Sequence, residues 1–155
     1  MIRLTCLLIL MAQPALALSC LRPDVARTYQ IAHESPATYV LAKGTITVRE
    51  GEVVHPGVNQ PAIEDYTVRA TFEGRLASPD GFDEPAEGDL TIEIGCAGNW
   101  CGGVPGGEVI AFIELRDGAA YLAQGACPQN TFAATPEIEA AALSCLTGGE
   151  CTPTE

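Results

Sequence analysis

The chain has 155 residues and a formal net charge of −12, with 20 acidic residues against 8 Lys and Arg residues. A surface this acidic repels nucleic-acid phosphates and anionic lipid headgroups, because proteins bind both by neutralising negative charge with Lys and Arg. We therefore expect no nucleic-acid partner and no membrane-surface binding. A basic protein partner and simple solubility both remain open.

The N-terminal residues have the layout of a secretory signal peptide. Arg3 is followed by an apolar run from Leu4 to Met11 and then by small residues, and the run is too short to span a bilayer. Small residues allow cleavage after Ala17 or after Ser19. We expect residues 1–17 to be removed and residues 18–155 to form a single exported domain, periplasmic or extracellular, that is monomeric and not inserted in a membrane.

The cysteines are consistent with export. The sequence has 7 cysteines, and removal of Cys6 with the signal peptide leaves an even set, which in an exported chain indicates disulfides. The members of the set are Cys20, Cys96, Cys101, Cys127, Cys145 and Cys151. Short separation predicts the pairs Cys96–Cys101 and Cys145–Cys151.

The first half of the chain predicts one helix and two strands. Residues 23–35 favour a short helix that has Pro23 in its first turn and ends before Pro36. Residues 37–48 are rich in β-branched side chains and predict a strand, with Gly44 as a bend or bulge. A loop over 50–62 follows. Residues 65–77 alternate apolar and polar side chains, which is typical of a strand with one buried face.

The second half predicts three strands and a helix. The acidic segment 78–89 is expected to be a solvated, turn-rich loop, and it lacks the alternate-residue ligand pattern of a calcium site. Residues 90–97, 108–118 and 119–127 read as strands, with Asp117-Gly118 as the turn of a hairpin. Residues 135–146 predict a helix capped by Thr135. Five strands with terminal helices indicate a mainly β domain that closes, or nearly closes, into a small barrel.

The stretch "CAGNWCGGVPGG" at residues 96–107 surrounds the only tryptophan of the chain. Its spacing fits neither the paired ligands of a zinc site nor the Cys-x-x-Cys of a redox enzyme. Glu108 stands where a phosphate-binding loop needs Lys. We expect no cofactor and no metal here, and interpret Cys96–Cys101 as a strap that closes the loop, with Trp100 packed on or beside the barrel. The alternative is an exposed Trp100 that anchors a binding partner.

The order of four short motifs resembles the netrin-like module, the OB-type barrel shared with the tissue inhibitors of metalloproteinases. Cys20 precedes "ATYVLAKG" and "YTVRATFEG", and "WCGG" precedes "AFIELRDGAAYLAQGAC", which ends in Cys127. The resemblance implies a five-stranded OB-type barrel and a Cys20–Cys127 disulfide. Those inhibitors open with Cys-x-Cys and present the free amino group of the first cysteine to the protease zinc. This chain has "LRPD" after Cys20 and therefore lacks the second cysteine. A free amino group on Cys20 would also require cleavage immediately before Cys20.

We expect an exported, non-enzymatic binding or accessory protein whose ligand the sequence does not identify. The alternatives are a protease inhibitor that acts through its N-terminal edge and a small periplasmic thiol enzyme or hydrolase. The sequence has neither a GxSxG nor an HExxH motif, and His33 and His55 have no catalytic partner nearby in the sequence. The residues expected to contact a partner are Leu21, Arg22, Asp24, Asn99, Trp100 and Val104.

Signal-peptide cleavage gives the first testable prediction. N-terminal sequencing of the exported protein is expected to find Leu18 as the first residue, with Cys20 as the second choice. A full-length chain that begins at Met1 and accumulates in the cytoplasm would contradict it.

Overall fold

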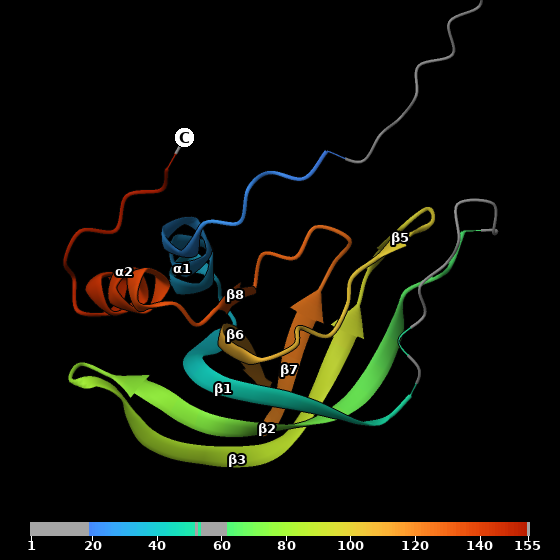
Figure 1. Cartoon of the computed structure of the whole chain (residues 1–155), viewed down its shortest axis with the longest axis horizontal. Coiled ribbons are helices and arrows are strands. Elements are labelled where there is room, and N and C mark those ends of the chain that lie inside the picture. The colour runs from blue at the N-terminus through green and yellow to red at the C-terminus, as the bar shows by residue number, and fades with distance from the viewer. Residues whose placement is uncertain (1–18, 52, 54–61, 155) are drawn as a thin grey trace, which may run out of the picture.

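The structure is a computed structural model that describes residues 19–51, 53 and 62–154 (Figure 1). The signal peptide expected at residues 1–17 and His55 lie outside the described residues. Within these described residues, two helices and eight strands follow one another as α1 (Val25–Glu34), β1 (Thr38–Glu50), β2 (Tyr66–Ser78), β3 (Gly81–Ile94), β4 (Cys96–Ala97), β5 (Trp100–Cys101), β6 (Glu108–Arg116), β7 (Ala119–Gln124), β8 (Thr131–Ala133) and α2 (Pro136–Leu146). The expected mainly β domain with a helix near each end is confirmed.

The helices begin at side-chain caps. In α2 the Thr135 hydroxyl accepts a hydrogen bond from the Ile138 N–H at 3.3 Å, and Pro136 occupies the first turn, as predicted. In α1 the cap is Asp24, whose carboxylate accepts the Arg27 N–H at 2.8 Å. Pro23 therefore precedes the cap, and the expectation that it opens the helix is wrong.

One six-stranded sheet carries the fold, in the order β1-β2-β3-β7-β6-β8, and β1 also pairs with β6. Strand β1 is antiparallel to β2 from Ala42 onward and antiparallel to β6 from Thr38 to Thr45, so both of its edges are bonded over Ala42–Thr45. The β3–β7 pair is parallel and the other pairs are antiparallel. Each of the strands β1, β2, β3, β7 and β6 therefore pairs with the next in this order, and β6 pairs with β1 again.

The sheet differs from the expected clean five-stranded barrel in two ways. The short strand β8 is added to β6, and only Leu90–Ile94 of β3 pair with β7, while the earlier residues of β3 pair with β2 alone. The expected loop over 78–89 is also wrong, because β3 begins at Gly81 after a two-residue turn. A strand that is paired on one edge and exposed tolerates the proline and the charges that made this segment look like a loop.

The hairpin between β6 and β7 turns where the sequence predicts. Asp117 and Gly118 have φ values of 50° and 80°, which is the left-handed conformation that tight hairpin turns require. Asp117 is the only non-glycine with positive φ among the described residues.

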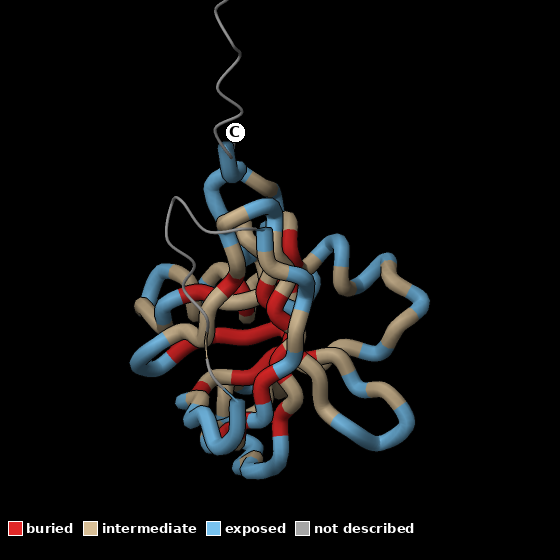
Figure 2. Tube along the Cα trace, turned by 90° about the vertical axis from the view of Figure 1, so that its right-hand side faces the viewer, coloured by how far each residue is buried: buried red, intermediate tan, exposed pale blue. Residues whose placement is uncertain are grey.

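Two apolar clusters form the core (Figure 2). The larger lies inside the ring of strands and includes fully buried side chains from β2, β3 and β7, among them Val68, Ile92 and Leu122. The second lies between the outer face of β1, β6 and β8 and the two helices, where Phe112 and Phe132 meet edge to face at 6.2 Å between ring centroids. The two helices therefore cover one side of the sheet, over β1, β6 and β8 (Figure 1).

Gly44 does not form the bulge that the sequence suggested, but lies directly opposite Gly74 in the β1–β2 ladder. A Cβ at Gly44 would lie 2.7 Å from the Gly74 Cα and 2.8 Å from a ring carbon of Phe72. Two glycines let these strands approach each other closely beneath the Phe72 ring.

Replacing Gly44 with alanine is therefore expected to lower the free energy of unfolding by about 1–3 kcal/mol, because backbone atoms must move to admit the methyl group. Chemical denaturation measures the change. Gly88→Ala in β3 is the matched control, since a Cβ there has nothing within 4 Å. Equal stability of the two variants would contradict the close approach.

Asp24 connects α1 to the C-terminal tail. Besides capping α1, its carboxylate accepts the Thr154 N–H at 2.9 Å and the Thr154 hydroxyl at 2.7 Å. Partial burial raises the pKa of Asp24, but the hydrogen bonds from Thr154 and from the Arg27 N–H together outweigh it and hold the pKa below its ordinary value. A lowered pKa in the folded state means that the ionised carboxylate stabilises the fold.

Asp24→Ala is expected to cost about 1 kcal/mol of stability at pH 7. Because the pKa is lowered on folding, this contribution is complete above the unfolded-state pKa of about 4 and disappears as the pH falls through the folded-state value. Denaturation of wild type and variant at neutral pH and near pH 3 measures the difference, with Glu34→Ala as an exposed acidic control. A difference that grows in acid would contradict the assignment.

Candidate functional site

The strap at residues 96–101 is a small disulfide-clamped hairpin. Cys96 and Cys101 lie directly opposite each other in the β4–β5 pair and are bonded, and Gly98 turns the hairpin with a φ of 62°. The hairpin is held from outside by the Asp65 carboxylate, which accepts the Cys96 N–H at 2.7 Å, and by the Gly98 carbonyl, which accepts the Ile63 N–H at 3.3 Å. A short disulfide loop of this kind has few alternative conformations.

Gly102 fastens the strap to the end of β7. Its N–H donates to the Gly95 carbonyl at 3.0 Å, and a Cβ at this position would collide with backbone atoms of Gln124 and Gly125. In "WCGG" the backbone therefore requires glycine at Gly102. It does not require glycine at Gly103, where a Cβ would meet nothing within 4 Å.

Trp100 lies on this rigid hairpin and is 62% exposed. It belongs to neither core cluster, so the structure favours the alternative of an exposed Trp100 over a Trp100 packed on or beside the barrel. Partner anchors are typically large aromatic side chains whose conformational freedom is already restricted, because little entropy is then lost on binding. Trp100 is a large aromatic residue whose backbone is held in the disulfide-closed hairpin.

The N-terminal segment is fastened close to the same place. Cys20 is bonded to Cys127, and the Gln129 side-chain amide donates to the Leu21 carbonyl at 3.4 Å. Leu21 is 72% exposed, and Arg22 is exposed as well. Gly102 of the strap packs against the backbone of Gln124 and Gly125, and Cys20 is bonded to Cys127, so both segments contact one short stretch of chain at and after the end of β7.

The six residues expected to contact a partner therefore divide into two groups. Leu21, Arg22 and Trp100 are exposed, whereas the Asp24 carboxylate caps α1 and Val104 packs against the inner core cluster. Asn99 is partly buried within the hairpin. We call Leu21, Arg22 and Trp100 the Trp100 face.

A hollow of about 430 Å³ lies next to the strap, between the start of β2 and the ends of β3 and β7. Tyr66, Ile94 and Gly125 line it, and so does Gln124, whose buried side-chain amide donates to the Thr131 hydroxyl at 2.8 Å. Sequence analysis did not find this hollow, because its walls come from three strands that are distant along the chain.

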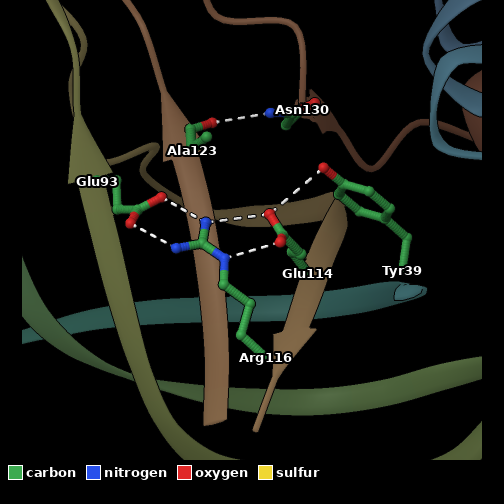
Figure 3. Close-up of polar contacts among 6 residues, drawn as sticks. All are labelled: Tyr39, Glu93, Glu114, Arg116, Ala123 and Asn130. Carbon is green, nitrogen blue, oxygen red and sulfur yellow. Dashed lines mark hydrogen bonds and ion pairs between the residues drawn. The ribbon is translucent and has the colours of Figure 1, made fainter. Parts of the chain in front are cut away.

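An ionic network on the outside of the sheet was also missed. Figure 3 shows the Arg116 guanidinium between two carboxylates, donating to both oxygens of Glu93 at 2.8 and 2.7 Å and to those of Glu114 at 2.7 and 3.0 Å. Its Cζ also lies 4.3 Å from the centroid of the Tyr121 ring, and the Tyr39 hydroxyl donates to Glu114 at 3.5 Å. The network joins β1, β3, β6 and β7.

The network shifts the pKa values of its charged members. The hydrogen bonds from Arg116 lower the pKa of Glu93 and of Glu114, while those two carboxylates raise the pKa of Arg116. Burial, followed by the Glu114 charge, raises the pKa of Tyr39. Each charge is paired and held ionised near neutral pH, which suits a cross-link between strands and not a group that exchanges protons with a substrate.

His33 and the cysteines of the described residues all make structural contacts. His33 stacks on Tyr29 with ring centroids 5.8 Å apart and forms no catalytic pair. The pairs Cys20–Cys127, Cys96–Cys101 and Cys145–Cys151 use all the cysteines of the described part of the chain, so a thiol nucleophile would have to come from elsewhere. Over residues 19–51, 53 and 62–154 no group of three His, Cys, Asp or Glu side chains is placed to hold a metal ion, and no helix is long and apolar enough to cross a membrane.

Comparison with known proteins adds no relative. No protein-family model matches the chain, and comparisons with curated proteins and with solved structures gave no match either. The function proposed below therefore rests on the geometry of the Trp100 face and on the chemistry of the chain itself.

Proposed function

We propose that this protein is an exported, non-enzymatic binding module that engages a protein partner through the Trp100 face. The observation that carries the proposal is the 62% exposure of the only tryptophan, on a hairpin closed by Cys96–Cys101. Leu21 adds a second exposed apolar side chain from a segment that is tied to the same stretch of chain. The 430 Å³ hollow beside the strap offers room for a side chain of the partner.

The framework is proposed to be an OB-type barrel of netrin-like organisation. Support comes from the pairing order, in which β1 bonds to both β2 and β6 and the single parallel pair joins β3 to β7. The Cys20–Cys127 disulfide is also the pair that the resemblance to the netrin-like module implies. Three disulfides favour an oxidising compartment, which supports export to the periplasm or the extracellular space.

Protease inhibition through the N-terminal edge is a second candidate. The Cys20–Cys127 disulfide favours it, because it holds the N-terminal segment close to the strap. In the netrin-like inhibitors the first cysteine provides a free amino group. In a chain that begins at Leu18, the nitrogen of Cys20 is part of a peptide bond and is not a free amino group. Assays of a panel of zinc proteases with protein that begins at Cys20 and at Leu18 separate the two candidates, since only the former could inhibit in this way.

Trp100→Ala tests the proposed face. Because the side chain is exposed, the variant should unfold within about 1 kcal/mol of wild type, whereas loss of a core tryptophan costs about 3–5 kcal/mol. Its affinity for the protein captured by cross-linking from the exported fraction should fall by about 2 kcal/mol or more.

Ile31→Ala is the matched control, because Ile31 on α1 is 64% exposed and lies outside the Trp100 face. This variant should bind the partner as wild type does. Retention of full affinity by Trp100→Ala, or equal losses in the two variants, would refute the proposed face.

A further inference from the structure

The sheet is hollowed at the other end of β3, away from the Trp100 face. An apolar hollow of about 160 Å³ opens here, which we call the edge hollow. Its walls include Phe72, Leu76, Leu90, Ile113, Leu115 and Ala120. A dry apolar cavity of about 150 Å³ can hold a benzene-sized group, so the edge hollow has room for one aliphatic side chain. Leu115 at its mouth is 39% exposed.

The edge hollow lies beside an unpaired stretch of sheet edge. Residues 81–89 of β3 pair with β2 but not with β7, which joins β3 only at Leu90. The Gly95 N–H donates to the Gln124 carbonyl at 3.0 Å, on the β7 side of β3. Since backbone groups alternate between the two edges of a strand, the Glu87 N–H and C=O and the Asp89 N–H point to the same side and lie beyond the β7 pairing, which begins at Leu90–Ala120. Such groups are a template for an added strand.

The side chains of β3 alternate in the same register. Leu90 belongs to the inner cluster and Ala86 packs against it, while Glu87 and Asp89 are exposed. Asp89 pairs with Arg49, and Glu87 forms no ion pair within the described part of the chain. A strand added at this edge would therefore place alternate side chains in the edge hollow and beside the two carboxylates.

We propose that residues 85–90 of β3 and the edge hollow bind an extended, basic peptide segment by strand addition, with one aliphatic side chain in the hollow and Lys or Arg side chains beside Glu87 and Asp89. Charge excludes a second copy of this chain as the occupant, because each copy carries a net charge of −12 and the two acidic edges would repel. Pro85 has no N–H to offer, so it limits pairing to a short segment. A short segment suits reversible peptide recognition better than the assembly of sheets.

The test uses the full mature protein and a capped peptide of sequence TKTKLKTKT, in which the lysines face one way and the leucine the other. NMR titration of protein labelled with ¹⁵N and with ¹³C in its methyl groups should shift the backbone amide signals of Glu87 and Asp89 and the methyl signals of Leu115. The acidic analogue TETELETET should not bind. An analogue with proline on each side of the leucine should bind at least about fivefold more weakly, since proline removes the ladder donors.

Two variants locate the contacts. Glu87→Lys should weaken the lysine peptide by about fivefold, the value of a good cross-strand charge pair. Leu115→Asp should weaken it by about tenfold or more, because the peptide leucine would then meet a charge. Glu34→Lys is the matched control, because it changes the net charge by the same amount at an exposed position at the end of α1. It should change the affinity for the lysine peptide less than twofold, because salt screens a charge that is far from the bound peptide.

Thermal unfolding of each variant separates loss of binding from loss of fold. The proposal is overturned if the amides of Glu87 and Asp89 do not shift at millimolar peptide, if the acidic analogue binds equally well, or if Glu34→Lys weakens binding as much as Glu87→Lys. It is also overturned if sedimentation shows that the protein dimerises through this edge, since the occupant would then be a second copy.

Discussion

Strand β1 is bonded on both of its edges, to β2 and to β6, and the rest of the structure depends on this double pairing. It bends the sheet back on itself, so that the inner faces of β1, β2, β3, β6 and β7 enclose one apolar cluster. The close approach of Gly44 and Gly74 permits the curvature, since side chains at these positions would push β1 and β2 apart. The helices then have one face left to cover, the outer side of β1, β6 and β8.

The same pairing determines where the two proposed recognition surfaces lie. Strand β3 is longer than the part of it that pairs with β7. Its C-terminal end leads into the strap, and its N-terminal half extends beyond the start of β7. One end presents a disulfide-clamped tryptophan and the other an apolar hollow with an unpaired backbone edge. Between them, Arg116 and its two carboxylates cross-link β3 to β6 over the outside of β7.

Local features of the sequence predicted the elements that depend on local chemistry. The Thr135 cap, the Asp117-Gly118 turn, the alternation in β2 and the short cysteine separations each belong to a few neighbouring residues. The first half of β3 was missed because Asp83, Glu84, Pro85 and Gly88 have low strand propensity. This part of β3 is a strand because it pairs with β2 along one edge. The sequence of the segment has no alternation of apolar and polar residues that would predict this pairing.

The candidate site was predicted in part, for the same reason. Trp100 and the N-terminal segment could be selected from the sequence because tryptophan and the cysteine pattern stand out there. The engagement of Asp24 could not be foreseen, because Thr154 lies 130 positions away in the chain. Neither could the Arg116 network or the edge hollow, whose members come together only when the sheet closes. Contacts set by topology leave no local signature.

Native-state amide hydrogen exchange tests the double pairing of β1 most directly. If both edges are bonded, the consecutive amides from Ala42 to Thr45 should all exchange slowly, because each N–H turns alternately to β2 and to β6. In β3 the amides of Thr91 and Glu93 should exchange slowly, and those of Glu87 and Asp89 fast. Alternating fast and slow exchange along Ala42–Thr45 would show that β1 is an edge strand and would contradict the closed pairing on which the account rests.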